Sequence, residues 1–108
     1  MGGITAQRKG KRGEEELTAL LREYGFQARR GAPLNYGTEP DVSGLPGVHI
    51  EVKRTERLNL SAALEQSKRD ALRFQDGFPV VIHRANRQKW RVTMELDDFI
   101  SLYRKGGY

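Results

Sequence analysis

Cysteine is absent from the 108 residues of this sequence. Disulfide bonds, thiolate metal sites and cysteine nucleophiles are therefore excluded, and we expect a reducing compartment, the cytoplasm of a cell or of a viral host. The sequence also lacks an apolar run of about 18 residues, so we expect no membrane-spanning helix. Residues 1–12 contain no apolar stretch of the kind found in secretory signals.

Acidic side chains are fewer than basic ones: 14 Asp and Glu stand against 19 Lys and Arg, for a formal net charge of +5. This balance favours a polyanionic partner, with nucleic acid ahead of an anionic membrane surface. The length suits one domain with a single core. We assign residues 9–108 to that domain and expect residues 1–8, which show no apolar periodicity, to be mobile.

Apolar periodicity and turn residues predict three helices and five strands. The first helix is expected from about Gly13 to Gly25, because three glutamates open it and leucines follow at helical spacing. The other predicted elements are strands at 26–30, 41–45, 48–54, 79–84 and 89–94, a helix at 58–75, and a last helix opened by Asp97 and Asp98. We therefore predict an α/β fold with a mixed central β-sheet flanked by helices, in the order α-β-β-β-α-β-β-α.

All three predicted helices carry an apolar line that should face the sheet. In the helix at 58–75 it consists of Leu60, Ala63, Leu64, Ser67, Ala71 and Phe74. In the first helix the line consists of Leu17, Leu20, Leu21 and Tyr24. In the last helix it consists of Leu96, Phe99, Ile100 and Tyr103. Trp90 is expected to pack in the core rather than to stack on a base.

Side chains alternate between the two faces of the strand predicted at residues 48–54. Glu51 and Lys53 therefore lie side by side, which by itself indicates no more than an ion pair. Asp41 begins the preceding strand, so a hairpin can bring its carboxylate to Glu51. Two close carboxylates repel each other and need a cation, and Mg²⁺ prefers such oxygen ligands. On its own, Asp41 is typical of a turn residue after Pro40.

A third carboxylate can come from the first helix. Glu14 lies three residues before Leu17 and so flanks the buried face, whereas Glu15 and Glu16 are expected to turn towards solvent. All three glutamates would also be favourable near a helix N-terminus without any further function. His49 and His83 have no partner at the spacing of zinc ligands, so we do not expect them to bind metal.

Pro40-Asp41 followed by Glu51-Val52-Lys53 has the PD-(D/E)XK form of the restriction-endonuclease-like nuclease superfamily. More closely, residues 9–95 resemble the archaeal-type Holliday-junction resolvases and their phage and bacterial relatives. The matching positions are Lys9-Gly10, Glu14, Glu16-Leu17, Gly25-Phe26, Arg30, Asp41, residues 50–53, Pro79-Val80-Val81 and Trp90-Arg91.

The resemblance implies a restriction-endonuclease-like core and a metal-dependent DNA phosphodiesterase. Asp41, Glu51 and the backbone carbonyl of Val52 would bind Mg²⁺, for which Mn²⁺ would substitute. Glu14 would complete this site, and Lys53 would be the catalytic lysine. No small-molecule cofactor is implied.

Other positions follow from the same resemblance. Arg30 would contact the DNA backbone. Gln66 is a candidate for the helix glutamine of some superfamily members, although an exposed helix glutamine explains it as well. These resolvases usually carry a basic residue directly after the helix glutamate, where this sequence has Glu15.

Basic residues flank the predicted site and can bind phosphates. Those nearest to it in the sequence are Lys9, Lys11, Arg12, Arg54 and Arg57, and a second group is Arg84, Arg87, Lys89 and Arg91. We therefore predict a Mg²⁺-dependent, structure-selective DNA endonuclease that acts on branched DNA. The alternatives are a less selective phage-type nuclease of the same superfamily and a DNA-binding module that has lost catalysis.

A homodimer is also expected, because a four-way junction has near two-fold symmetry and must be cut at two opposed positions. The surface predicted for this contact lies around residues 80–82 and 92–94, with Phe99 and Tyr103 beside it.

Overall fold

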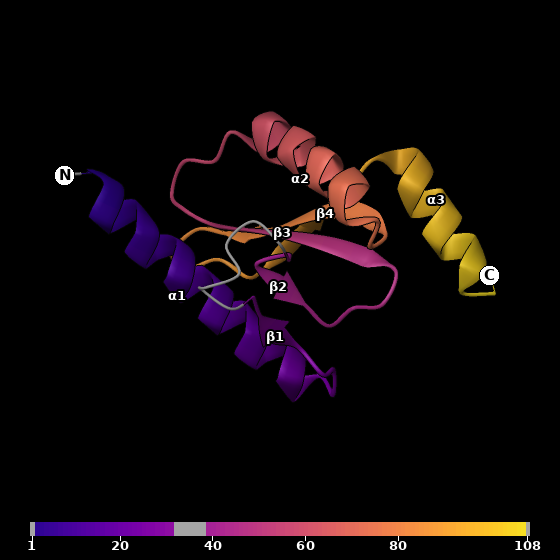
Figure 1. The fold of residues 1–108 in the computed structure, drawn as a ribbon, viewed down its shortest axis with the longest axis horizontal. Helices are drawn as coiled ribbons and strands as arrows, with labels where there is room; N and C mark the ends of the chain where they lie inside the picture. Colours follow the sequence, from indigo (N-terminus) through magenta and orange to yellow (C-terminus); the bar gives the residue numbers. More distant parts are fainter. Residues whose placement is uncertain (1, 32–38, 108) are drawn as a thin grey trace.

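The computed structural model describes residues 2–31 and 39–107, with side chains from residue 10 onward. Eight elements follow one another there in the predicted order (Figure 1). They are α1 (Gly2–Glu23), β1 (Arg29–Arg30), β2 (Val42–Ser43), β3 (Val48–Arg54), α2 (Leu60–Phe74), β4 (Phe78–Arg84), β5 (Arg91–Thr93) and α3 (Leu96–Lys105). The predicted bounds of β3 are confirmed, whereas β1, β2 and β5 are shorter than predicted.

The five strands form one sheet in the order β1-β2-β3-β4-β5. β3 and β4 run parallel, with α2 as their connection, and the other neighbours are antiparallel. The predicted mixed α/β architecture is thus confirmed. α1 and α2 lie on opposite faces of the sheet, and both contact β3 (Figure 1).

The apolar core lies between α1 and the sheet. Its buried residues include Leu17 and Leu21 of α1, Ile50 of β3, and Val80 and Ile82 of β4. Trp90 packs against this core, as predicted. Gly13 lets α1 approach β3 closely, because a Cβ atom there would lie 3.0 Å from the Cβ of Arg54. A larger residue at position 13 would push the helix away from the strand.

Small side chains line the inner side of α2. The buried residues of this helix are Ala63, Ser67 and Ala71. The Ser67 hydroxyl donates a 2.8 Å hydrogen bond to the backbone carbonyl of Val80 in β4. Because these side chains are short, α2 lies close to the sheet, and Asp70 comes near the polar side chains of β3.

The first helix begins earlier than predicted. α1 begins at Gly2 and not near Gly13, so residues 2–8 are helical where we expected a segment without regular structure. Ala6, Gln7, Arg8 and Lys9 favour helix, which extends α1 towards the N-terminus. The glutamates that we expected to open the helix therefore lie in its middle. No helix in the described part of the chain is long and apolar enough to cross a membrane.

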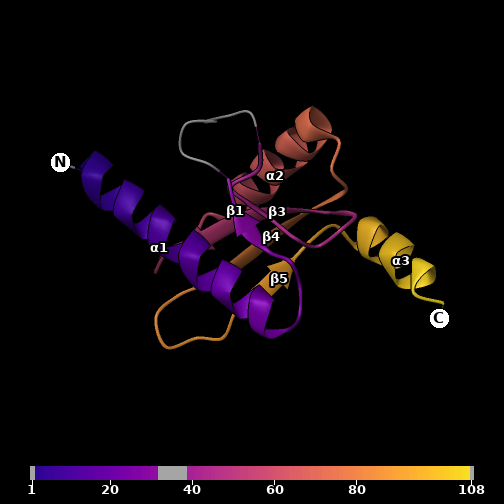
Figure 2. The same ribbon diagram turned by 60° about the horizontal axis from the view of Figure 1, so that its bottom comes forward.

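The apolar face predicted for α3 does not pack on the sheet. All ten residues of α3 are described, and none is buried. Leu96, Phe99 and Tyr103 are exposed, and Ile100 is half-buried. α3 closely follows the short strand β5 and extends away from the sheet (Figure 2). Tyr24 is likewise 72% exposed, because α1 ends before this residue can reach the sheet.

Candidate metal and nucleic-acid site

β3 presents Glu51 and Lys53 on the face that α2 covers. Their side chains lie on the same side of the strand because two residues make one full repeat of the pleat. The Glu51 carboxylate is almost fully buried, and its Oε1 lies 3.5 Å from Nζ of Lys53. The Lys53 side chain keeps one third of its surface exposed, at 33%. The strand thus combines a buried acid with a cation that reaches solvent.

Asp41 lies across the hairpin from Glu51. Val42 of β2 pairs with Ile50 of β3, and the same antiparallel register places Asp41 opposite Glu51. The negative charge of Asp41 raises the pKa of Glu51 and also that of Glu14. Asp41, just before β2, is therefore within electrostatic reach of both Glu14 of α1 and Glu51 of β3.

Glu14 is held by a guanidinium. Burial is the largest cause that raises its pKa, followed by the charge of Asp41, whereas Arg30 lowers it. Nη2 of Arg30 lies 3.3 Å from Oε1 of Glu14, and Nη1 lies 3.4 Å from Oε1 of Glu15. Arg30, for which the resemblance implies contact with the DNA backbone, thus forms ion pairs with two glutamates of α1.

Glu51 is a buried carboxylate whose charge is only partly compensated. Burial is the main cause that raises its pKa; Lys53 lowers the pKa, and Asp41 and Asp70 raise it. Such a set of hard oxygen donors with unbalanced negative charge is what Mg²⁺ binds. The donors present therefore fit a divalent cation.

The structure also brings together a group that the sequence did not predict. One ligand atom from each of His49, Glu51 and Asp70 lies within 4.8 Å of the others. Within residues 10–31 and 39–107, this is the group of three potential metal ligands whose atoms lie this close together. Neither Glu14 nor Asp41 belongs to it. Alternation along β3 places His49 beside Glu51, but the docking of α2 on the sheet supplies Asp70.

Gln66 lies on α2 one turn before Asp70 and is half-buried. Residues four apart share one side of a helix, so Gln66 faces the same region of the sheet as Asp70. This position is compatible with the role that the resemblance gives it.

Seven chains of solved structures match this chain. One is Hjc, a Holliday junction resolvase from the archaeal hyperthermophile Archaeoglobus fulgidus. The two chains are 29% identical, the match covers 80% of this chain and 72% of that one, and the TM-score is 0.58. No protein-family model and no curated protein matches the sequence.

The likeness supports the Hjc-type resolvase family for this chain. The restriction-endonuclease-like fold predicted from the sequence is confirmed by it, and a nuclease function is supported. The roles of single residues rest on the geometry described above.

The basic residues expected around a resolvase-type site occupy two environments. Lys11, Arg12 and Arg57 are exposed. The side chain of Arg54 is bound by Glu16, because its Nε donates a 2.8 Å hydrogen bond to Oε2 of that residue. Lys9 lies in α1, and its side chain is outside the described part of the structure.

Glu16 does not turn to solvent as predicted. Its side chain is only 31% exposed, and its second oxygen lies 2.8 Å from Nη1 of Arg84. The carboxylate thereby bridges Arg54 at the end of β3 and Arg84 at the end of β4. The bridge needs the parallel pairing of two strands far apart in sequence, which no local pattern reveals.

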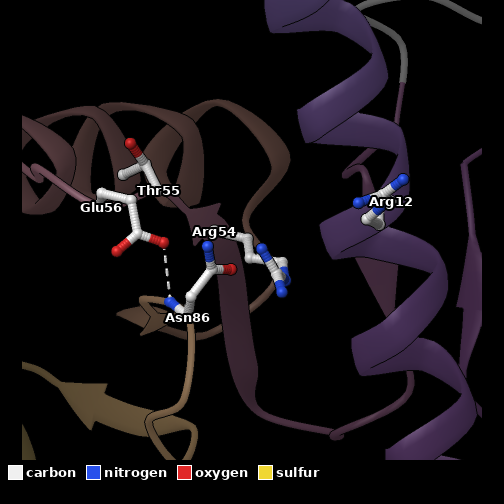
Figure 3. Close-up of a pocket in the computed structure, with 5 residues that line it drawn as sticks. All are labelled: Arg12, Arg54, Thr55, Glu56 and Asn86. Atoms are coloured by element: carbon white, nitrogen blue, oxygen red, sulfur yellow. Dashed lines mark hydrogen bonds between the residues drawn. The ribbon is translucent and has the colours of Figure 1, made fainter.

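A pocket lies between α1 and the end of β3 (Figure 3). Its lining residues are Arg12, Arg54, Thr55, Glu56 and Asn86. The backbone N–H of Asn86 donates a 2.8 Å hydrogen bond to Glu56, which ties the loop after β4 to this pocket. Two arginines from separate elements thus face one polar depression, as a phosphate-binding surface requires.

Proposed function

We propose that this chain is a Mg²⁺-dependent, structure-selective DNA endonuclease of the Holliday-junction resolvase type, which hydrolyses phosphodiester bonds in the cytoplasm of a cell or of a viral host. The observation that carries the proposal is that the charge of Asp41 acts on both Glu14 of α1 and Glu51 of β3, while Nζ of Lys53 lies 3.5 Å from Oε1 of Glu51. A protein that only binds DNA gains nothing from acids at its phosphate surface, since they repel the ligand. The likeness to an archaeal resolvase points the same way.

The carboxylates of Asp41, Glu51 and Glu14 and the backbone carbonyl of Val52 would hold the cation, with Mn²⁺ able to replace Mg²⁺. When bound, the cation lowers the pKa of a water molecule and balances negative charge on the phosphate. Arg30 would orient Glu14 through its hydrogen bond, and its charge opposes the rise in the pKa of Glu14 that burial and Asp41 cause.

Lys53 contacts Glu51 and also reaches solvent. Its ammonium can orient the attacking water or stabilise the charge that develops on the phosphate. Gln66, one turn before Asp70 on α2, would assist in the positioning of the substrate.

We assign DNA binding to the basic residues around the site. They are Lys9, Lys11, Arg12, Arg30, Arg54 and Arg57. Arg12 and Arg54 share the pocket of Figure 3 and would contact one phosphate together.

A cleavage assay with Mg²⁺ tests the proposal on a four-way junction, a flap, a duplex and a single strand of related sequence. We expect the wild-type chain to cut the junction fastest. Asp41→Asn and Lys53→Met should abolish cutting while DNA binding persists, and Glu23→Gln, a change at an exposed glutamate of α1, should behave as wild type. Full activity of Asp41→Asn would contradict the assignment of the metal ligands.

The contacts of Arg30 favour a second candidate function, a less selective nuclease of the same superfamily. Arg30 is engaged by Glu14 and Glu15 and is therefore less available to a junction. Equal rates on duplex and junction would support this candidate. Tight binding without cutting of any substrate, with either Mg²⁺ or Mn²⁺, would indicate a DNA-binding module that has lost catalysis.

The chain would act as a homodimer. Residues 80–82, part of the surface predicted for the contact, are buried within the chain and cannot form it. In β5 and α3, the exposed large apolar side chains are those of Val92, Leu96, Phe99, Leu102 and Tyr103. A second copy covering this face would supply two sites in the opposed arrangement that a junction needs.

Sedimentation velocity tests the dimer at micromolar protein, without DNA and then with a junction. We expect a species of roughly twice 12.3 kDa. Phe99→Glu should give a monomer, whereas Leu72→Glu on α2, also an exposed apolar position, should leave the dimer intact. A wild-type chain that stays monomeric in both conditions would remove the resolvase assignment and leave the simpler nuclease.

A further inference from the structure

His49 is a buried histidine whose two ring nitrogens have different environments. Its side chain is only 2% exposed. Nδ1 lies 2.8 Å from Oδ2 of Asp76, in the turn after α2. Nε2 is buried without a hydrogen-bond partner. A buried polar atom without a partner lowers stability unless something binds it.

Nε2 is the atom that His49 can offer to a ligand, because Asp76 occupies Nδ1. A ring nitrogen of His49 and one carboxylate oxygen from each of Glu51 and Asp70 lie within 4.8 Å of one another. Two atoms bound to one cation at about 2.1 Å each are at most about 4.2 Å apart, so a small inward movement closes the group around an ion.

Asp76 gives this group a feature of metal sites. A histidine that binds metal through one nitrogen usually donates the other N–H to a carboxylate, which fixes the tautomer and orients the ring. The Nδ1–Asp76 contact is such an arrangement. Phe74 stacks near the ring, with centroids 6.1 Å apart and planes 17° apart, and further restricts its motion.

We propose that His49 Nε2, Glu51 and Asp70 form a second cation site on the α2 side of Glu51, for a divalent transition-metal ion. A nitrogen ligand beside two carboxylates suits Mn²⁺, Co²⁺ or Zn²⁺ better than Mg²⁺, which prefers oxygen alone. Glu51 would then be shared between this site and the Mg²⁺ site proposed above. The inference concerns metal binding by the free protein and holds whether or not the chain cuts DNA.

Mn²⁺ binding to the DNA-free protein tests the proposal, with free Mn²⁺ counted by electron paramagnetic resonance in excess Mg²⁺. We expect one Mn²⁺ per chain that Mg²⁺ does not displace. His49→Asn keeps a donor for Asp76 but removes Nε2, and Asp70→Asn removes a charge, so each should weaken binding at least tenfold. Asp76→Asn, at a positioning residue, should weaken it about 10–100-fold.

His83→Asn is the matched control, because His83 lies on β4 outside the group and its Nε2 bonds Thr93. It should bind Mn²⁺ as wild type, and Asp41→Asn should do so as well. Unchanged Mn²⁺ binding by a folded His49→Asn variant would overturn the proposal. Loss of cleavage in Asp41→Asn with Mn²⁺ retained would separate this site from the proposed catalytic one.

A measurement on the wild-type chain keeps the proposal testable if His49→Asn does not fold. With Co²⁺ bound at Nε2, the Nδ1–H proton should give a paramagnetically shifted proton resonance that exchanges slowly, because it is buried against Asp76. This resonance should vanish in D₂O only slowly. Its absence at saturating Co²⁺ would show that His49 does not bind metal.

Discussion

The two faces of β3 are built from alternate residues of one strand, yet they have opposite properties. On the α1 side Ile50 belongs to an apolar core with Leu17 and Leu21. On the α2 side the strand buries His49 and Glu51, at 2% and 7% exposure. The first face stabilises the fold by removing apolar area from water. The second keeps charged and polar groups out of water at a cost in stability, which is typical of a functional site.

The largest difference between the faces should appear in the cleavage rate. Glu51→Gln removes a proposed metal ligand without a change in size, and should lower the rate by about 10³-fold or more. Ile50→Val, one residue away on the other face, should leave the rate within about twofold, although it costs about 0.5–1.5 kcal/mol of stability. Single-turnover kinetics below the melting temperature compare the two variants. Equal rate losses would show that both faces act only through folding.

For the free energy of unfolding, we expect the opposite order, with the larger loss on the α1 side. Leu17→Ala leaves a cavity in the core on the α1 side and should lower the free energy of unfolding by about 2–5 kcal/mol. Ser67→Ala on α2 loses one buried hydrogen bond, of 2.8 Å, and should cost about 0.5–1.5 kcal/mol. Urea unfolding followed by circular dichroism measures both. A larger loss from Ser67→Ala would place the main stabilising contact on the α2 side instead.

The buried charge itself should be visible without metal. Burial raises the pKa of Glu51 in the folded state above 4.5, so the folded chain binds this proton more tightly than the unfolded chain. The cost to stability therefore builds up as pH rises from 4.5 through the raised pKa, and it is absent at lower pH. Glu51→Gln should be more stable than wild type at pH 7 in EDTA, by on the order of 1 kcal/mol.

This advantage of Glu51→Gln should disappear below about pH 4.5, and Mg²⁺ should stabilise wild type but not the variant. Glu65→Gln, at an exposed glutamate on the opposite side of α2, is the control and should show no such pH dependence. Thermal melts of wild type, Glu51→Gln and Glu65→Gln over this pH range test these expectations. A variant less stable than wild type at pH 7 would show that Lys53 compensates the buried charge in full.

The smallest expected effect is a change in DNA affinity, caused by substitutions at and just beyond the end of β3. Arg57→Gln should lower DNA affinity uniformly across substrates and reduce the slope of log K against log salt by about 0.9. Arg54→Gln should do the same and should also lose stability, because Glu16 holds this guanidinium in the folded chain. Fluorescence anisotropy between about 50 and 200 mM salt measures the slope. An unchanged slope for Arg57→Gln would remove it from the DNA surface.

Much of the proposed catalytic site follows from local pattern. Strand alternation places Glu51 beside Lys53, and the Pro46-Gly47 turn brings Asp41 to the opposite position, since both depend on residues close in sequence. The start of α1 was predicted wrongly, because glutamate is favourable inside a helix as well as at its N-terminus, so the glutamates at 14–16 do not mark where the helix begins.

The sequence by itself determined the order of the elements, the two faces of β3 and the net positive charge, because each depends on composition or on short-range periodicity. Only the tertiary structure decided which distant side chains meet. The bridge from Glu16 to Arg54 and Arg84 requires α1 docked on the parallel pair β3 and β4, and the group of His49, Glu51 and Asp70 requires α2 docked on β3. The exposure of α3 was decided at the same level, since an amphipathic pattern records that a helix has an apolar face but not what covers it.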